Sequence, residues 1–175
     1  MSVSKLTYSG AGGGGEAYVP GMDVRWATVP ESSEVARLLH DFNTEFDTPS
    51  PGVEVLTARL EHLLARKSTA ALLAGEPAVA VGLVTYRPSV WYPGPVALLD
   101  ELYVEPQLRD RGIGTALITR LVADSIAAGV SAIEVNVDEG DVDARRFYER
   151  HGFISGDVRP DELALYYAME LPPRQ

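Results

Sequence analysis

A short loop between an apolar strand and a glycine-containing helix constrains this fold more than any other sequence feature. Residues Val96–Val104 have the apolar, β-branched character of a strand, and Gly112–Ala128 carries apolar residues spaced by three and four. The loop between them holds two arginines, and the helix opens with glycines at positions 112 and 114. Glycines there let a ligand approach the backbone closely, while the free N–H groups favour an anion. This segment predicts a diphosphate-binding site.

Two known phosphate-binding motifs do not fit this loop. A dinucleotide fingerprint needs a small residue three places after its second glycine, and Leu117 stands there. A P-loop needs Gly-Lys-Ser or Gly-Lys-Thr, and neither tripeptide occurs in the sequence. The other glycine-rich segment, Ser9–Gly15, has no strand pattern before it, and its composition is typical of a flexible linker. We therefore expect a flexible tail over residues 1–22 and one domain over residues 23–172.

Apolar periodicity and turn residues predict an α+β domain. A capping box over Thr28–Glu31 marks the start of a first helix, and a second helix follows the prolines around Ser50. Turn-rich segments separate the three central strands, which predicts an antiparallel meander. The expected sheet is mixed, mostly antiparallel and flanked by helices. Its strands are expected at 23–28, 68–73, 78–86, 96–104, 133–137 and 163–171, with later helices at 112–128 and 141–151.

Charge and residue usage exclude several classes of function. With 15 basic and 25 acidic residues the formal net charge is −10, which disfavours general binding to nucleic acids or anionic membranes. The sequence has no cysteine, which excludes disulfides, thiolate zinc sites and a cysteine nucleophile. The histidines lack metal-ligand spacing, and the acidic residues at 138–143 fit helix capping better than a calcium loop. No membrane span or signal peptide is evident, so we expect a cytoplasmic protein without a metal.

Two motifs together resemble a known family. The spacing Arg109-x-x-Gly112-x-Gly114 resembles the coenzyme A pyrophosphate signature of the GNAT superfamily of N-acetyltransferases. The segment Asp141–Phe153 is similar to the family pattern Asn-x-x-Ala-x-x-x-Tyr-Glu-x-x-Gly-Phe, with Asp141 in place of the asparagine. The expected order of strands and helices is also that of the GNAT fold, over about residues 23 to 171. The resemblance implies a twisted sheet whose strands splay apart where the cofactor binds.

The same resemblance implies acetyl-CoA as a co-substrate. The backbone of Leu102–Val104 would pair with the two amides of the pantetheine arm, and a strand amide near it would bind the acetyl oxygen. The loop and the helix start would wrap the diphosphate. The residues assigned to the cofactor in this way are Leu102, Tyr103, Val104, Arg109, Asp110, Arg111, Gly112, Ile113, Gly114, Thr115, Asp141 and Tyr148.

The implied acceptor is a primary amine of a small molecule or a peptide, and it requires a base. Only roughly one part in 10³ of such an amine is neutral at pH 7. Glu101 and Asp100 are the first candidates, although strand alternation sends their side chains to opposite faces unless a bulge intervenes. Glu134 is the third candidate. Tyr148 is the expected general acid toward the coenzyme A thiolate, because a phenol stays protonated at neutral pH.

The sequence leaves several alternatives open for the mechanism, the donor and the class of function. Without a cysteine, direct attack of the amine in a ternary complex is the simplest mechanism, and the donor can be another acyl-CoA. A GNAT-fold module that binds coenzyme A or another ligand without turnover is a different class of function. A tRNA-acetylating toxin is disfavoured by the acidity. Family members are commonly dimers. Phe46 and Trp91 are candidates for the border of the acceptor pocket, or for ordinary loop packing.

Overall fold

The computed structural model describes residues 22–66, 68–154 and 169. Within this part the chain divides into two compact units, with the boundary between Asn136 and Val137. The first strand begins at Val24, close to the expected start of the domain. The expected tail lies outside the described residues except for Met22, so the boundaries of tail and domain stay predictions.

The first unit contains most of the predicted strands and helices, in the predicted order. Two short 3-10 turns, Val29–Glu31 and Pro106–Leu108, precede α1 and follow β4. None of the described helices is long and apolar enough to cross a membrane. The elements are β1 (Val24–Trp26), α1 (Ser32–Glu45), α2 (Val53–Leu64), β2 (Thr69–Ala74), β3 (Ala80–Arg87), β4 (Val96–Val104), α3 (Ile113–Ala127) and β5 (Ala132–Val135).

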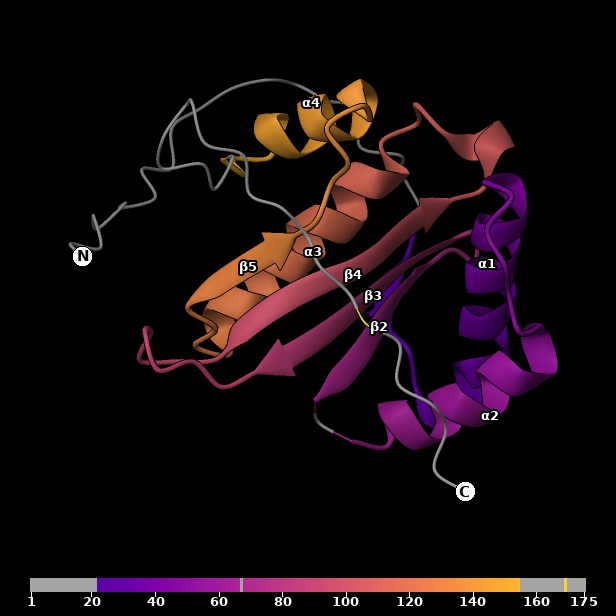
Figure 1. The fold of residues 1–175 in the computed structure, drawn as a ribbon, viewed down its shortest axis with the longest axis horizontal. Coiled ribbons are helices and arrows are strands. Elements are labelled where there is room, and N and C mark those ends of the chain that lie inside the picture. Colours follow the sequence, from indigo (N-terminus) through magenta and orange to yellow (C-terminus); the bar gives the residue numbers. More distant parts are fainter. Residues whose placement is uncertain (1–21, 67, 155–168, 170–175) are drawn as a thin grey trace. The chain divides into compact units, whose positions relative to one another are not determined.

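The sheet has five strands in the described residues, in the order β1-β2-β3-β4-β5. The first three pairings are antiparallel, as the turn-rich connections predict. β4 and β5 are parallel, because α3 returns the chain between them as a crossover helix (Figure 1). The predicted mixed, mostly antiparallel sheet is thus confirmed.

Apolar side chains are buried on both faces of this sheet. Helices α1 and α2 cover one face and α3 covers the other (Figure 1). On the α1 face, Leu38 and Leu60 pack with strand residues such as Val81 and Tyr103. On the α3 face, Leu117 and Leu121 are almost completely buried, as are Leu72 and Leu99 of the strands. The side chains of β4 therefore divide between two environments.

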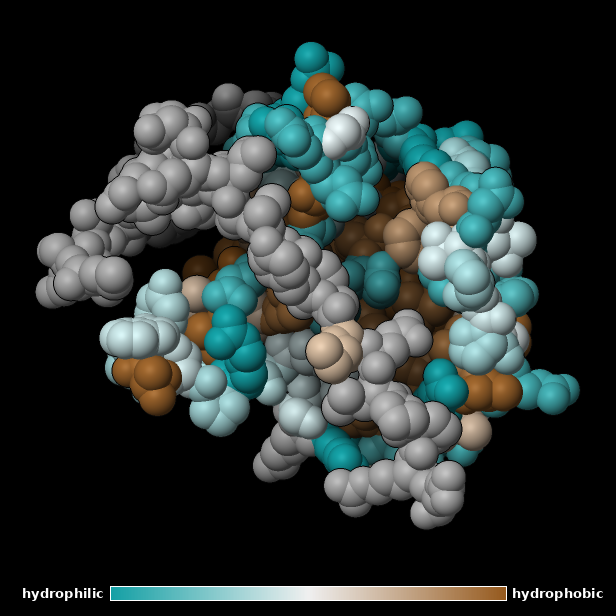
Figure 2. All heavy atoms as spheres, viewed as in Figure 1, coloured by the Kyte–Doolittle hydropathy of each residue, from teal (hydrophilic) through white to brown (hydrophobic). Residues whose placement is uncertain are grey.

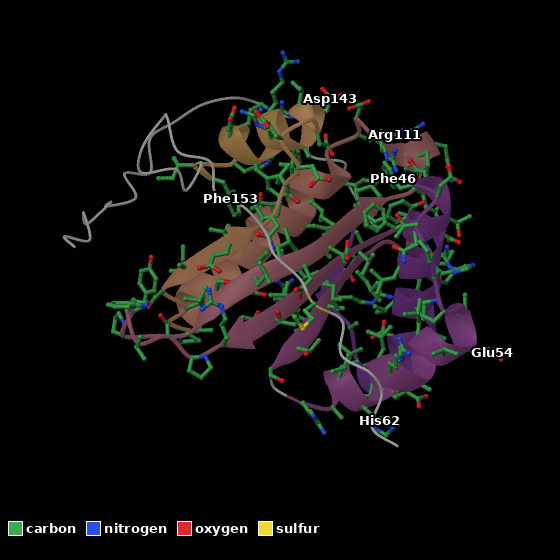
Figure 3. All side chains as sticks on the ribbon, in the orientation of Figure 1. Phe46, Glu54, His62, Arg111, Asp143 and Phe153 are labelled. Atoms are coloured by element: carbon green, nitrogen blue, oxygen red, sulfur yellow. The ribbon has the colours of Figure 1, made fainter. Side chains whose placement is uncertain are left out.

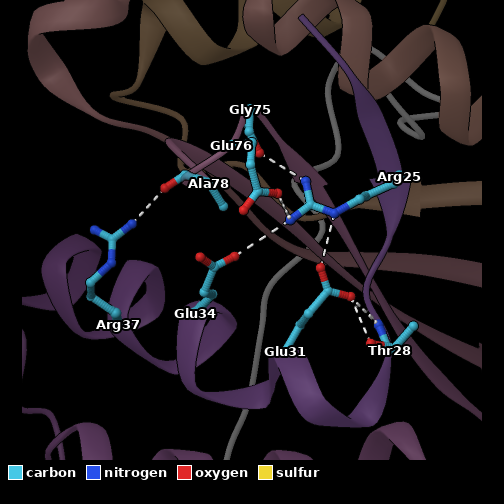
Figure 4. A network of polar contacts seen from close by, with 8 residues as sticks. All are labelled: Arg25, Thr28, Glu31, Glu34, Arg37, Gly75, Glu76 and Ala78. Atoms are coloured by element: carbon cyan, nitrogen blue, oxygen red, sulfur yellow. Dashed lines mark hydrogen bonds and ion pairs between the residues drawn. The ribbon is translucent and has the colours of Figure 1, made fainter.

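A polar network fixes the start of α1 to the edge of the sheet (Figure 4). The Glu31 carboxylate accepts hydrogen bonds of 2.7 Å from the backbone N–H and the hydroxyl of Thr28, which confirms the predicted capping box. The guanidinium of Arg25 on β1 contacts the carboxylates of Glu31, at 2.9 Å, and Glu76, at 3.2 Å. It also donates to the carbonyl of Gly75, in the turn between β2 and β3.

The second unit contains α4 (Val142–Arg150). Its N-terminus is capped by the Asp141 carboxylate, which accepts a hydrogen bond of 2.9 Å from the backbone N–H of Ala144. Gly152, with φ of 85°, follows its end, as predicted. The acidic segment before α4 thus supplies a helix cap, as expected from the sequence. The last expected strand, 163–171, lies outside the described residues apart from Met169.

Candidate active site

β4 separates from β5 halfway along its length. Their parallel pairing runs from Val96 opposite Ala132 to Leu99 opposite Val135, and β5 ends there. β4 continues to Val104 and stays paired with β3 on its other side. Among the described residues, no strand pairs with the open edge over 100–104, which includes the predicted pantetheine-binding residues 102–104. Backbone groups on such an edge can bind an extended ligand as an added strand.

A β-bulge on β4 lies at the point where the two strands part. Leu83 of β3 is opposite Glu101, and the next residue, Val84, is opposite Leu99, so Asp100 is the extra residue on β4. The side chain and backbone of Thr85 lie near the Asp100 carboxyl group and act to lower its pKa. Thr85 shares its face of β3 with Leu83, and therefore with Glu101. The bulge thus interrupts the simple alternation, and both carboxylates lie on the α1 face.

The electrostatic surroundings of these two carboxylates differ from those of an ordinary surface pair. Burial raises the pKa of Glu101 above its usual value, and the negative charge of Asp100 raises it further. Burial also raises the pKa of Asp100, although the side chain and backbone of Thr85 act in the opposite direction. Within the described residues neither carboxylate forms an ion pair. A cation brought to this place would therefore be stabilised.

Glu134, the third predicted base, has a cationic partner. It lies on β5 opposite Leu98, on the same face as Thr85. Its carboxylate forms an ion pair of 2.6 Å with Arg87 of β3. A carboxylate that already neutralises a guanidinium attracts a second cation less strongly than Glu101 does.

The loop after β4 has the backbone that its glycines predict. Gly112 adopts the left-handed conformation, with φ of 76° and ψ of 5°, directly before the first residue of α3. Asp110 is also left-handed, with φ of 58°. The N–H groups of Ile113 and Gly114 occupy the first turn of α3, where no carbonyl of the helix can accept them. Arg111 is exposed, and no ion pair joins it to another described residue (Figure 3). These features suit an anionic ligand.

Arg109 does not extend freely from this loop. Its two terminal nitrogens donate to the two carboxylate oxygens of Glu45, at the end of α1, both at 2.7 Å. Its Nε donates to the carbonyl of Val104 at 3.0 Å, and the guanidinium lies 5.7 Å from the centre of the Tyr103 ring. Nothing local in the sequence indicated Glu45, which stands 64 positions away from Arg109.

Aromatic rings continue from Tyr103 along the α1 face. The centre of the Phe42 ring lies 5.5 Å from that of Tyr103 and 5.2 Å from that of Phe46. Phe46 is 58% exposed although it is apolar. Figure 2 shows apolar residues in a recessed part of this face, beside α1. Trp91, in the loop between β3 and β4, is 80% exposed.

The remaining predicted residues belong to two groups. Thr115 lies in the first turn of α3, in the first unit. Asp141 and Tyr148 belong to the second unit, where Asp141 caps α4 and the half-buried Tyr148 ring lies 5.4 Å from the Phe153 ring. The structure thus brings Asp100 and Glu101 together beside the open edge of β4, and the roles of Asp141 and Tyr148 stay predictions. No cluster of potential metal ligands occurs in the described residues.

Comparison with known proteins gives consistent matches. The model of the acetyltransferase (GNAT) family matches residues 34–153. An Arthrobacter sp. FB24 protein with a proposed acetyltransferase activity is 48% identical, with a TM-score of 0.77 over 85% of this chain and 96% of that one. An uncharacterized N-acetyltransferase of Methanocaldococcus jannaschii is 38% identical over 63 residues, which are 36% of this chain and 28% of that protein.

A further solved structure shares the fold. It is an aminoglycoside acetyltransferase from an uncultured soil metagenomic sample, in complex with sisomicin. The match covers 85% of this chain and 97% of that one, with a TM-score of 0.69 and 18% identity. At this identity the likeness supports the architecture and not a shared substrate.

Proposed function

Because this chain belongs to the GNAT family of acetyltransferases, we propose that it transfers an acetyl group from acetyl-CoA to a primary amine of a small molecule or a peptide. The chain is an N-acetyltransferase, and the family implies acetyl-CoA as its donor. One observation carries the finer proposal. At the bulge, β4 brings an open strand edge together with two carboxylates that form no ion pair with another described residue.

The donor would bind along β4 and the start of α3. The open edge over 102–104 offers backbone groups to the pantetheine amides, and one strand amide there would stabilise the acetyl oxygen. Gly112 in its left-handed conformation exposes the first N–H groups of α3 to the diphosphate. Arg111 adds a positive charge to that loop. The residues present therefore fit the donor.

Glu101 is the residue that we assign as the base. It is half-buried, its pKa is raised, and its neighbour Asp100 adds a second negative charge on the same face. An ammonium group bound there can give up a proton to Glu101, directly or through a water. Glu134 is the weaker candidate because it is paired with Arg87.

The transfer needs one bond to form and one to break. The neutral amine nitrogen attacks the thioester carbonyl, the carbon–sulfur bond breaks, and the coenzyme A thiolate leaves. We assign the proton that this thiolate takes up to the Tyr148 hydroxyl, as the family resemblance implies. The nitrogen, now bonded to the acetyl carbon, gives up its extra proton to the resulting phenolate and becomes a neutral amide. The chain has no cysteine to carry an acetyl group, so direct attack in a ternary complex is the proposed mechanism.

Thiol release from acetyl-CoA over a panel of primary amines tests this function. The absence of cysteine is an advantage, because a thiol reagent then reports only released coenzyme A. With a reactive amine, Glu101→Gln should lower kcat/KM about 100-fold, as expected for loss of a general base. Glu61→Gln removes an equal charge from the exposed surface of α2 and should have no effect.

Other outcomes identify the alternatives. Acetyl-CoA binding without release for any amine would favour a binding module. Release of coenzyme A only from thioesters with a longer acyl chain would show that the donor is not acetyl-CoA. Equal activity of Glu101→Gln and the unaltered chain would remove Glu101 from the mechanism.

A further inference from the structure

The side chain of Arg109 is fully engaged within the protein. Its guanidinium forms two parallel hydrogen bonds of 2.7 Å with the Glu45 carboxylate, which is the strongest geometry for this ion pair. The third nitrogen, Nε, donates to the carbonyl of Val104 at 3.0 Å. The guanidinium carbon lies over the Tyr103 ring, 5.7 Å from its centre. One side chain therefore connects α1, the end of β4 and the loop before α3.

The charge of this arginine is neutralised where it stands. For the guanidinium to bind a diphosphate, it would have to leave Glu45 and the Val104 carbonyl. Its departure would break two charge-assisted hydrogen bonds and leave the Glu45 carboxylate without this partner. Isolated surface ion pairs contribute little, but this one is bidentate and has two further contacts.

The loop that follows needs such an anchor. Asp110, the next residue, has φ of 58°, a conformation that residues with a side chain rarely adopt. Gly112 is left-handed two residues later. Glycine adopts this backbone freely, but at Asp110 it carries a cost that the surrounding structure must offset. Arg109 is bound to Glu45 directly before this segment.

We propose that Glu45 and Arg109 form a positioning pair that holds the acetyl-CoA loop in its binding conformation, and that Arg109 does not itself contact the diphosphate. The proposal rests on the proposed function, because it concerns the donor site of that reaction. Glu45 thereby becomes a determinant of donor affinity although it lies on α1, outside the sequence motif.

A double-mutant cycle tests the pair through acetyl-CoA binding, measured by calorimetry. Glu45→Ala and Arg109→Ala should each weaken binding about tenfold, and the double variant should be no worse than either. Steady-state kinetics should show a raised KM for acetyl-CoA, with kcat and the amine KM within about twofold of the unaltered chain. A merely structural role would lower the melting temperature without this selective change in KM.

Arg109→Lys distinguishes positioning from direct contact. Lysine keeps the positive charge and can bind a phosphate as a point charge, but it cannot form the two parallel bonds to Glu45. We expect it to bind acetyl-CoA as weakly as Arg109→Ala. Glu34→Ala is the matched control, because Glu34 is also a carboxylate on α1 that pairs with an arginine, Arg25 of β1. It lies about 16 Å along the helix from Glu45. This variant should leave acetyl-CoA affinity unchanged.

The outcomes separate this inference from the proposed function. Additive losses in the cycle, or near-normal binding by Arg109→Lys, overturn the positioning role alone. Absence of acetyl-CoA binding by the unaltered chain overturns the proposed function and this inference together. If the unaltered chain binds acetyl-CoA but shows no turnover, the dissociation constants of the variants in the cycle still decide whether Glu45 and Arg109 act as a pair.

Discussion

At the scale of single residues, Asp100 and Glu101 illustrate how one extra residue changes the chemistry of a strand. In a regular strand they would face opposite sides of the sheet. The bulge at Asp100 places both on the α1 face, where burial and mutual repulsion raise the pKa of Glu101. A raised pKa makes the ionised carboxylate a stronger base. In the proposed mechanism, the neighbouring charge would therefore favour proton removal by Glu101.

Replacing Asp100 with asparagine tests this tuning. The negative charge of Asp100 raises the pKa of Glu101, so Asp100→Asn should lower that pKa. Glu101 acts in its ionised form, which is lost as the pH falls through its pKa. The acidic limb of the pH profile of kcat/KM should therefore move to lower pH, and the rate at neutral pH should fall less than in Glu101→Gln. An unmoved limb would contradict the coupling, and a complete loss of activity would identify Asp100 as the base.

This residue-scale detail could be predicted only in part from the sequence. The two carboxylates stand out because they precede the glycine-containing loop. Their common face could not be derived, because it depends on the register of Leu83 and Val84 on β3. The contact between Glu45 and Arg109 is likewise invisible in the sequence, since it joins two segments that meet only through the tertiary fold.

At the scale of elements, the order of the strands and helices follows from local signals in the sequence. Periodicity and capping residues predicted the order of helices and strands from β1 to α4, because these signals are local. The ends of the helices and strands differ from the predicted ones. The helix predicted from Thr28 begins as a 3-10 turn, and β5 ends at Val135 rather than at residue 137. That early end leaves the neighbouring edge of β4 open.

Two glycines with the same backbone, at opposite ends of α3, test the role of this element. Gly112 and Gly129 have φ of 76° and 73°, so an alanine at either position costs about 1 kcal/mol in strain. Nothing lies within 4 Å of a Cβ added at Gly129. Both Gly112→Ala and Gly129→Ala should lower the melting temperature, but only Gly112→Ala should weaken acetyl-CoA binding, about tenfold. Equal affinities of the two variants would exclude this helix start from the donor site.

At the scale of the whole molecule, the acidity of the chain has a local exception. The net charge of −10 disfavours an anionic donor, and Glu45 neutralises Arg109. In the proposed donor site, attraction for the diphosphate would then come from Arg111 and the first N–H groups of α3. The carboxylates of Asp100 and Glu101 give the proposed amine-binding region a negative charge. The molecule thus separates regions suited to an anionic donor and a cationic acceptor.

The extent of the catalytic domain is a further prediction at this scale. The family match begins at residue 34 and β1 begins at Val24, both beyond the glycine-rich segment. A variant without residues 1–21 should therefore keep its melting temperature and its kcat/KM to within about twofold. Met22 is retained, because its sulfur lies near Gly75. A large loss of activity in the shortened chain would show that the domain extends into the segment before Met22.

The open edge of β4 has a consequence for the solubility of the protein. An unpaired strand edge is a template on which another chain can add a strand and begin aggregation. Bulges and charges that interrupt such an edge are established protections, and Asp100 and Glu101 supply both at its beginning. We therefore expect the two residues proposed for amine binding also to oppose strand addition by another chain along this edge.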